Sequence, residues 1–119
     1  MLKFFLLVLT IATILTPKYS FAIDRDRTMN VVVTAYTSRV EETDDTPFTT
    51  ASNTQVRDGI VATNMFPFGT KLRIKGFDKV FIVEDRMNRR FKDRIDIWFS
   101  RLEDAKNFGV KTLEIEILN

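Results

Sequence analysis

The sequence contains no cysteine and no histidine. These absences exclude zinc fingers, cysteine–histidine nucleophiles, serine–histidine–aspartate triads and imidazole bases, and they exclude disulfides as well. Carboxylates, hydroxyls, amides or basic side chains must therefore perform any chemistry, and we expect no cofactor and no metal ion. Hydrophobic residues make up 45% and charged residues 29% of the chain, which is typical of one small globular domain.

Residues 1–22 have the form of a secretory leader. Lys3 provides a short positive region, residues 4–15 are apolar, and Ser20 and Ala22 place small residues where a signal peptidase cleaves. The apolar run is about a dozen residues long, whereas a membrane-spanning helix needs roughly 20. We therefore expect a signal peptide, a secreted or periplasmic protein and no stable membrane anchor. A retained anchor stays open as the alternative.

The apparent basicity of the chain comes from this leader. It holds Lys3 and Lys18 and no acid, so the 18 basic and 16 acidic residues become 16 and 16 after residue 22. Nucleic-acid binding depends on clustered positive charge that neutralises phosphates. A neutral domain argues against such a partner, so we expect no nucleic acid.

Residues 23–119 predict a single, mainly β domain. A helix is expected to begin with Ser100 and Glu103 as a capping box and to end at Gly109 in a left-handed conformation. Six short strands in so few residues favour a closed barrel, which hides strand edges. The expected strands cover residues 29–37, 59–63, 70–74, 79–84, 94–99 and 113–117. The polar loop 41–54 is long enough to suggest a function.

The strand 94–99 carries the first candidate site residues. Its alternation places Ile95, Ile97 and Phe99 on the core side. Asp96 and Trp98 then share the other face, where an indole could stack on a sugar ring beside an acid. The alternative is that Asp96 pairs with Arg94 on the same face while Trp98 covers an edge of the core.

Asp85 ends a strand eleven positions before Asp96. If both carboxyl groups reach one poorly solvated cleft, the pKa of one of them rises, which makes a proton donor at neutral pH. The alternative is that Asp85 pairs with Arg86, Arg89 or Arg90. A secreted domain that binds metal through scattered aspartates is a third hypothesis, although no calcium-loop signature is present.

The order of short motifs along the chain resembles the 3D domain family, named for three aspartates. The motifs are 34–36 Thr-Ala-Tyr, 50–52 Thr-Ala-Ser, 59–62 Gly-Ile-Val-Ala, 67–71 Pro-Phe-Gly-Thr-Lys, 83–85 Val-Glu-Asp and 95–99 Ile-Asp-Ile-Trp-Phe. The resemblance spans about 31–118. It implies a six-stranded double-psi β-barrel with one short helix before the last strand. Related domains occur at the end of membrane-bound lytic transglycosylase A and in resuscitation-promoting and spore-associated wall proteins.

The resemblance also implies a lytic transglycosylase that acts on peptidoglycan glycan strands without water. Asp96 matches the aspartate that serves as acid and base, and Asp85 matches the second aspartate. Asn64 stands where the family has its first aspartate. With Thr34 and Tyr36, we expect Asn64 to orient the glycan.

Trp98 is expected to contribute stacking to the same glycan site. The rival hypothesis is a non-catalytic wall-binding module, because barrels of this type also occur in expansin-like proteins, which bind glycan without measurable hydrolysis. We expect a monomer in either case.

Overall fold

The computed structural model of the protein describes residues 27–38 and 48–119. The expected leader, residues 1–22, and the first part of the long polar loop lie outside the described residues. The elements in chain order are β1 Thr28–Tyr36, β2 Ile60–Thr63, β3 Lys71–Ile74, β4 Val80–Asp85, β5 Arg94–Trp98, α2 Leu102–Phe108 and β6 Lys111–Ile117.

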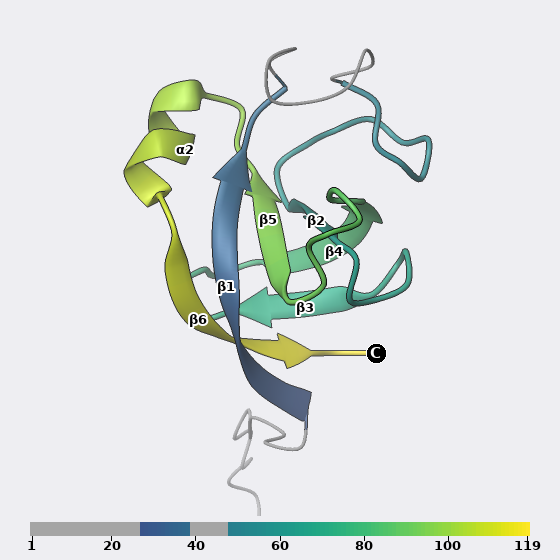
Figure 1. Ribbon diagram of the computed structural model, residues 1–119, viewed down its shortest axis with the longest axis vertical. Coiled ribbons are helices and arrows are strands. Elements are labelled where there is room, and N and C mark those ends of the chain that lie inside the picture. Colours follow the sequence, from purple (N-terminus) through teal and green to yellow (C-terminus); the bar gives the residue numbers. More distant parts are fainter. Residues whose placement is uncertain (1–26, 39–47) are drawn as a thin grey trace, which may run out of the picture.

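The six strands close into a barrel in the order β1-β5-β2-β4-β3-β6, with one short helix before the last strand (Figure 1). The predicted mainly β fold is therefore confirmed. Two neighbouring pairs, β1 with β5 and β2 with β4, run parallel, and the other four pairs are antiparallel. This order is compatible with a double-psi barrel. No strand of the described barrel is left with an unpaired edge, because closure gives each one two neighbours.

Alternating apolar side chains fill the interior of the barrel. On β5, Ile95 and Ile97 are buried while Arg94, Asp96 and Trp98 are only partly covered, as the sequence pattern predicts. On β3, Leu72 and Ile74 face inward and the two basic residues face out. The core consists of Val31, Val33, Val61, Leu72, Ile74, Phe81, Val83, Ile95, Ile97 and Ile115.

The helix α2 begins later than its sequence signal indicates. Arg101, with extended backbone, occupies the N-cap position and makes no capping hydrogen bond through its side chain, so the expected Ser100 cap is wrong. The reason is that Glu103 pairs with the Arg101 guanidinium at 3.1 Å instead of reaching back to residue 100. Gly109 ends the helix with a positive φ of 67°, as expected, although its ψ of −134° lies outside the left-handed helical region.

A β-bulge shapes the end of β4. Val61 of β2 lies opposite Val83, but the next residue, Ala62, lies opposite Asp85. Glu84 is therefore the extra residue, and its side chain pairs with Arg57. Without the bulge, strict alternation from Phe81 and Val83 would turn Asp85 towards the core.

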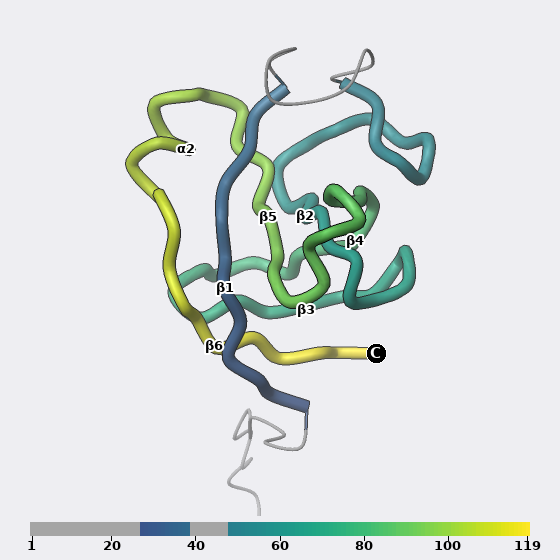
Figure 2. Tube along the Cα trace, viewed as in Figure 1, coloured from purple at the N-terminus to yellow at the C-terminus, as the bar shows by residue number. Residues whose placement is uncertain are grey.

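The connection from β4 to β5 folds back beside the barrel wall formed by these strands (Figure 2). The helix α2 packs near β1 at one end of the barrel. In the part of the chain that the structure describes, no helix has the length and apolar character needed to span a membrane.

The two valines of β4 test the assignment of the core. Val83 is 0% exposed and Val80 is 39% exposed. We expect Val83→Ala to lower the free energy of unfolding by about 2–3 kcal/mol, because it removes buried methyl groups and leaves a cavity. Val80→Ala should cost less than about 1 kcal/mol. Urea unfolding monitored by Trp98 fluorescence measures both, and equal losses would contradict the assignment.

Candidate functional site

Four neighbouring strands align the two candidate aspartates in one row. Thr34 of β1 lies opposite Asp96 of β5, Asp96 lies opposite Ala62 of β2, and Ala62 lies opposite Asp85 of β4. Since neighbouring strands are about 4.8 Å apart, the Cα atoms of the two aspartates are about 10 Å apart. Both aspartates therefore flank the same residue of β2.

Asp85 is held in place by three hydrogen-bond donors. Its Oδ1 accepts the backbone N–H groups of Ala51 and Arg86, each at 2.9 Å, and its Oδ2 accepts the Tyr36 hydroxyl at 2.9 Å. Two of these donors come from segments that are distant in the sequence. The carboxyl group therefore has a fixed orientation at the end of β4.

Thr34 positions the second carboxyl group. Its Oγ1 donates to Asp96 Oδ1 at 2.9 Å. Both residues are partly buried on the outer face of the barrel wall. Thr34 and Tyr36 share one face of β1, as the sequence predicts. The hydroxyl of Thr34 contacts Asp96, and the hydroxyl of Tyr36 contacts Asp85.

Tyr36 connects the two carboxyl groups electrostatically. Burial, then the charge of Asp85, then the hydrogen bond to Asp85, and finally the charge of Asp96 raise the pKa of Tyr36 well above its ordinary value of 10.0. All four causes favour the neutral phenol. Tyr36 is therefore neutral at physiological pH, and its hydroxyl donates to Asp85.

Trp98 borders this group of residues. It lies opposite Tyr36 in the parallel register of β1 and β5, and its Nε1 donates to Ser38 Oγ at 2.8 Å. The side chain is only partly buried. The structure thus brings Thr34, Tyr36, Asp85, Asp96 and Trp98 to one region of the barrel wall.

Asn64 has a different position and a different set of partners. Its Nδ2 donates to the backbone carbonyls of Met87, Asn88 and Phe91 at 2.9–3.1 Å, and its Oδ1 accepts the N–H of Met87 at 3.2 Å. Both ends of the amide therefore bind the connection between β4 and β5. Asn64 fixes that connection beside the aspartates.

Arg86 follows Asp85 directly, but its guanidinium has other partners. It donates to the carbonyls of Thr63 and Phe66 at 2.7 and 3.0 Å and lies 3.9 Å from the centre of the Phe68 ring. Asp85 therefore contacts Arg86 through the backbone N–H of Arg86 and not through its guanidinium group. The guanidinium of Arg94 pairs with Asp93 at 3.6 Å.

The segment 48–55 also contributes to the site, through contacts that its sequence alone does not specify. Thr50, which is 4% exposed, joins a network of hydroxyls with Ser52 and Thr54. The Ser52 N–H donates to the Glu84 carbonyl at 3.1 Å, which places Ala51 against Asp85. The clustered hydroxyls of the Thr-Ala-Ser motif are the signal that could have indicated this role.

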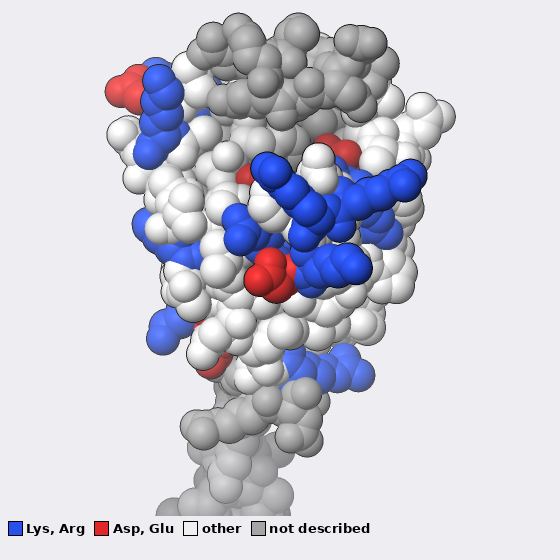
Figure 3. All heavy atoms as spheres, in the orientation of Figure 1, with Lys and Arg blue, Asp and Glu red and all other residues white. Residues whose placement is uncertain are grey.

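A basic surface lies next to the site. Residues 86–94 contain five basic residues and one acid, and we call this segment the basic loop. Figure 3 shows lysine and arginine side chains gathered over the connection between β4 and β5. Within the described ranges, no three aspartate or glutamate side chains form a group that could hold a metal ion.

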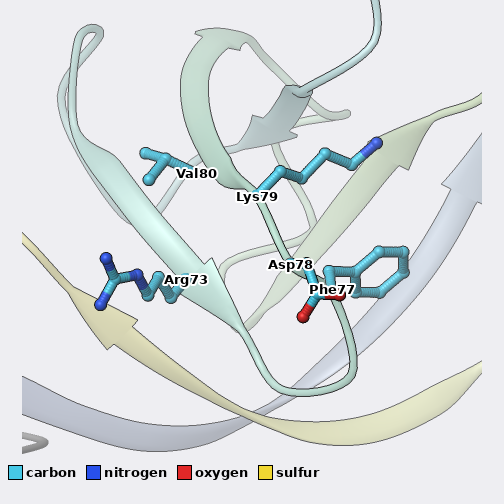
Figure 4. Close-up of a pocket in the computed structure, with 5 residues that line it drawn as sticks. All are labelled: Arg73, Phe77, Asp78, Lys79 and Val80. Atoms are coloured by element: carbon cyan, nitrogen blue, oxygen red, sulfur yellow. The ribbon is translucent and has the colours of Figure 1, made fainter. Parts of the chain in front are cut away.

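A pocket of about 370 Å³ lies elsewhere, at the turn between β3 and β4 (Figure 4). It is lined by Arg73, Phe77, Asp78, Lys79 and Val80. Val80 begins β4 whereas Asp85 ends it, so the pocket is at the opposite end of that strand from the candidate site. None of the pocket residues belongs to the site.

No protein-family model matches the chain, and no curated protein matches it.

The environment of Tyr36 predicts how it titrates. The variant Tyr19→Phe leaves Tyr36 as the only tyrosine of the chain. We expect no tyrosinate absorbance near pH 10 while the circular dichroism is that of the folded protein. Because the folded-state pKa is raised, the stabilisation is present below about pH 10 and is lost as the pH rises above it. In denaturant, the same variant should titrate near pH 10; titration there in the folded state would contradict the site geometry.

The Asn64 contacts predict that a carboxylate is not tolerated in its place. Asn64→Asp removes the donors to three carbonyls, so we expect a loss of about 1–3 kcal/mol in the free energy of unfolding at neutral pH. The loss should shrink near pH 4, where the carboxyl group takes up a proton and becomes a donor.

The matched control is Asn88→Asp in the same segment. Asn88 Oδ1 accepts the Arg90 N–H at 3.1 Å, and a carboxylate oxygen can accept the same bond. We expect this variant to stay within about 0.5 kcal/mol of the original protein. Equal losses for the two variants would show that Asn64 does not act as a donor to the loop.

Proposed function

We propose that the protein is a peptidoglycan lytic transglycosylase that cleaves the glycosidic bond between MurNAc and GlcNAc without water. The observation that carries the proposal is that Asp85 and Asp96 flank the same residue of β2 and that the partly buried Tyr36 lies within the electrostatic reach of both. The missing histidine and cysteine leave carboxyl groups as the acids and bases of the chain. The resemblance to the 3D domain supplies the substrate class.

In the proposed reaction, Asp96 acts first as acid and then as base. Its carboxyl proton passes to the glycosidic oxygen as the bond from that oxygen to C1 breaks. The C6 hydroxyl of the same sugar then attacks C1, and its proton returns to the Asp96 carboxylate. The product carries a 1,6-anhydro end, and Asp96 recovers its starting form.

The neighbouring residues support this proposal by position and charge. Thr34 orients the Asp96 carboxyl group, while Asp85 supplies negative charge near the oxocarbenium-like transition state. Tyr36, kept neutral, holds Asp85 in place, and Trp98 is proposed to stack its ring on the sugar. We assign Asn64 a structural role: it holds the connection between β4 and β5 and does not contact the glycan directly.

The setting of this function is the cell wall. The leader-like residues 1–22 support export of the chain, and the glycan strands are the partner on which it acts. We propose that the remainder of the chain works in the secreted or periplasmic space.

A non-catalytic wall-binding module is the second proposal, and Asn64 favours it. The amide stands at the position of the first family aspartate and is engaged by the loop backbone. The site therefore holds two carboxyl groups and lacks the third. Such a module would retain the row of polar side chains and bind glycan without cleaving it.

Substitution of Asp96 distinguishes these proposals. We expect Asp96→Asn to reduce the release of anhydro-muropeptides from purified peptidoglycan by about 10²–10⁴-fold, because a positioned acid and base contributes that much to the rate. Mass spectrometry detects the products, which are lighter by one water than hydrolysis products.

The control is Asp78→Asn, an exposed aspartate in the turn before β4. It should leave the product yield unchanged, and both variants should unfold at the same denaturant concentration as the original protein. Unchanged cleavage by Asp96→Asn would remove the catalytic assignment. Bound but intact glycan with the original protein would select the binding module.

A further inference from the structure

The positive charge of the domain is concentrated in the basic loop. Its five basic residues outweigh a single acid, whereas the rest of residues 23–119 holds 11 basic and 15 acidic residues, given totals of 16 and 16. Arg89, Arg90 and Lys92 are exposed. The neutral overall charge therefore conceals a local cationic surface, which Figure 3 shows on one face of the molecule.

We propose that the basic loop binds oxyanions displayed along the glycan strand while the strand lies across the row formed by Asp85 and Asp96. This inference rests on the proposed function, because it deepens the description of the same substrate. It assigns Arg89 and Lys92 a role in binding the substrate.

The loop is held as a fixed scaffold for these cations. Asn64 binds its carbonyls at Met87, Asn88 and Phe91, and the Phe91 N–H closes a turn on the Asn88 carbonyl at 3.0 Å. The carbonyls of Asn88 and Phe91 face Asn64, and the side chains of Arg89 and Arg90, which lie between these two residues, are exposed to solvent. An ordered loop loses less conformational entropy on binding than a flexible one.

Aromatic rings fix three arginines of the loop, Arg86, Arg90 and Arg94. The guanidinium groups of Arg90 and Arg94 each lie 4.6 Å from the centre of the Phe91 ring. At the start of the loop, Arg86 is bound to backbone carbonyls and stacks on Phe68. The side chains of Arg89 and Lys92 make no ion pair or hydrogen bond with the residues that the structure describes, so their charges are available to a ligand.

The basic loop is adjacent in sequence to both candidate aspartates. It begins directly after Asp85 and ends two residues before Asp96. Asn64, which holds its middle, lies two residues after Ala62, the residue that both aspartates flank. A polymer long enough to cross the row of aspartates must therefore pass close to these cations.

Oxyanions suit this surface because guanidinium groups bind carboxylates and phosphates through paired hydrogen bonds. Peptidoglycan has two sources of such anions: the carboxyl groups of its peptides, and phosphodiester polymers attached to the wall. Either source presents negative charge beside the glycan backbone. Both sources offer the loop the same kind of ligand, an oxyanion attached to the glycan strand that lies across Asp85 and Asp96.

The test measures binding of the full chain to purified peptidoglycan by co-sedimentation. We expect Arg89→Gln/Lys92→Gln to weaken binding about fivefold at low salt, because two exposed charge contacts are lost. The difference should vanish as ionic strength rises from roughly 0.01 M to 1 M, where the Debye length falls from about 30 Å to about 3 Å.

The matched control is Lys71→Gln/Lys75→Gln. It removes the same charge from exposed positions on and after β3, the strand opposite β5 in the barrel order. This control should bind like the original protein. Equal weakening by both double variants would show a general charge effect and overturn the proposal.

Two substrate treatments identify the source of the anion. If conversion of the peptide carboxyl groups to amides, with a carbodiimide and methylamine, abolishes the difference between the original protein and Arg89→Gln/Lys92→Gln, the loop binds peptide carboxylates. If removal of phosphodiester polymers by hydrofluoric acid abolishes it, the loop binds phosphates. Persistence of the difference after both treatments together would overturn the proposal, since the wall then carries no oxyanion.

The outcome for the loop is separable from the outcome for cleavage. Failure of the proposed function appears as absence of anhydro products from the original protein, whatever the variants bind. Failure of the loop proposal appears as equal binding at low salt by the original protein and Arg89→Gln/Lys92→Gln, even if cleavage proceeds.

Discussion

The placement of strand β2 between β5 and β4 is the constraint on which the rest of the structure depends. All four residues Ile60–Thr63 are buried, and the backbone pairs on both sides, antiparallel to β5 and parallel to β4. A strand without an exposed residue has little freedom to slide, because each shift of one position would exchange the residues facing the core. The register of β2 therefore fixes how far along the barrel wall Asp96 lies on β5 and Asp85 lies on β4.

The barrel and the candidate site are joined by hydrogen bonds that cross long sequence separations. Tyr36 of β1 reaches Asp85 of β4, although β5 and β2 lie between those strands in the barrel order. Ala51 approaches Asp85 from the polar segment before β2. Three separate parts of the chain thus converge on one carboxyl group, so its orientation depends on closure of the whole barrel.

Local patterns predicted most of the fold and part of the site. Alternation identified the inward faces of β3 and β5, and the end of β4 at Asp85 was visible in the sequence. The bulge at Glu84 was not, because the apolar run before it continues the same alternation and only the pairing with β2 reveals the extra residue. The partners of Asn64 were equally hidden, since they lie 23–27 positions further along the chain.

The Asn64 contacts have a consequence for how this surface can diversify. They hold the loop through backbone carbonyls at Met87, Asn88 and Phe91, so they do not depend on the identity of the exposed side chains. Positions 89 and 92 can thus be exchanged while the path of the main chain is kept. The Asn64 amide holds the main chain of the loop, whereas two of the loop's five positive charges belong to side chains that make no hydrogen bond or ion pair with the described residues.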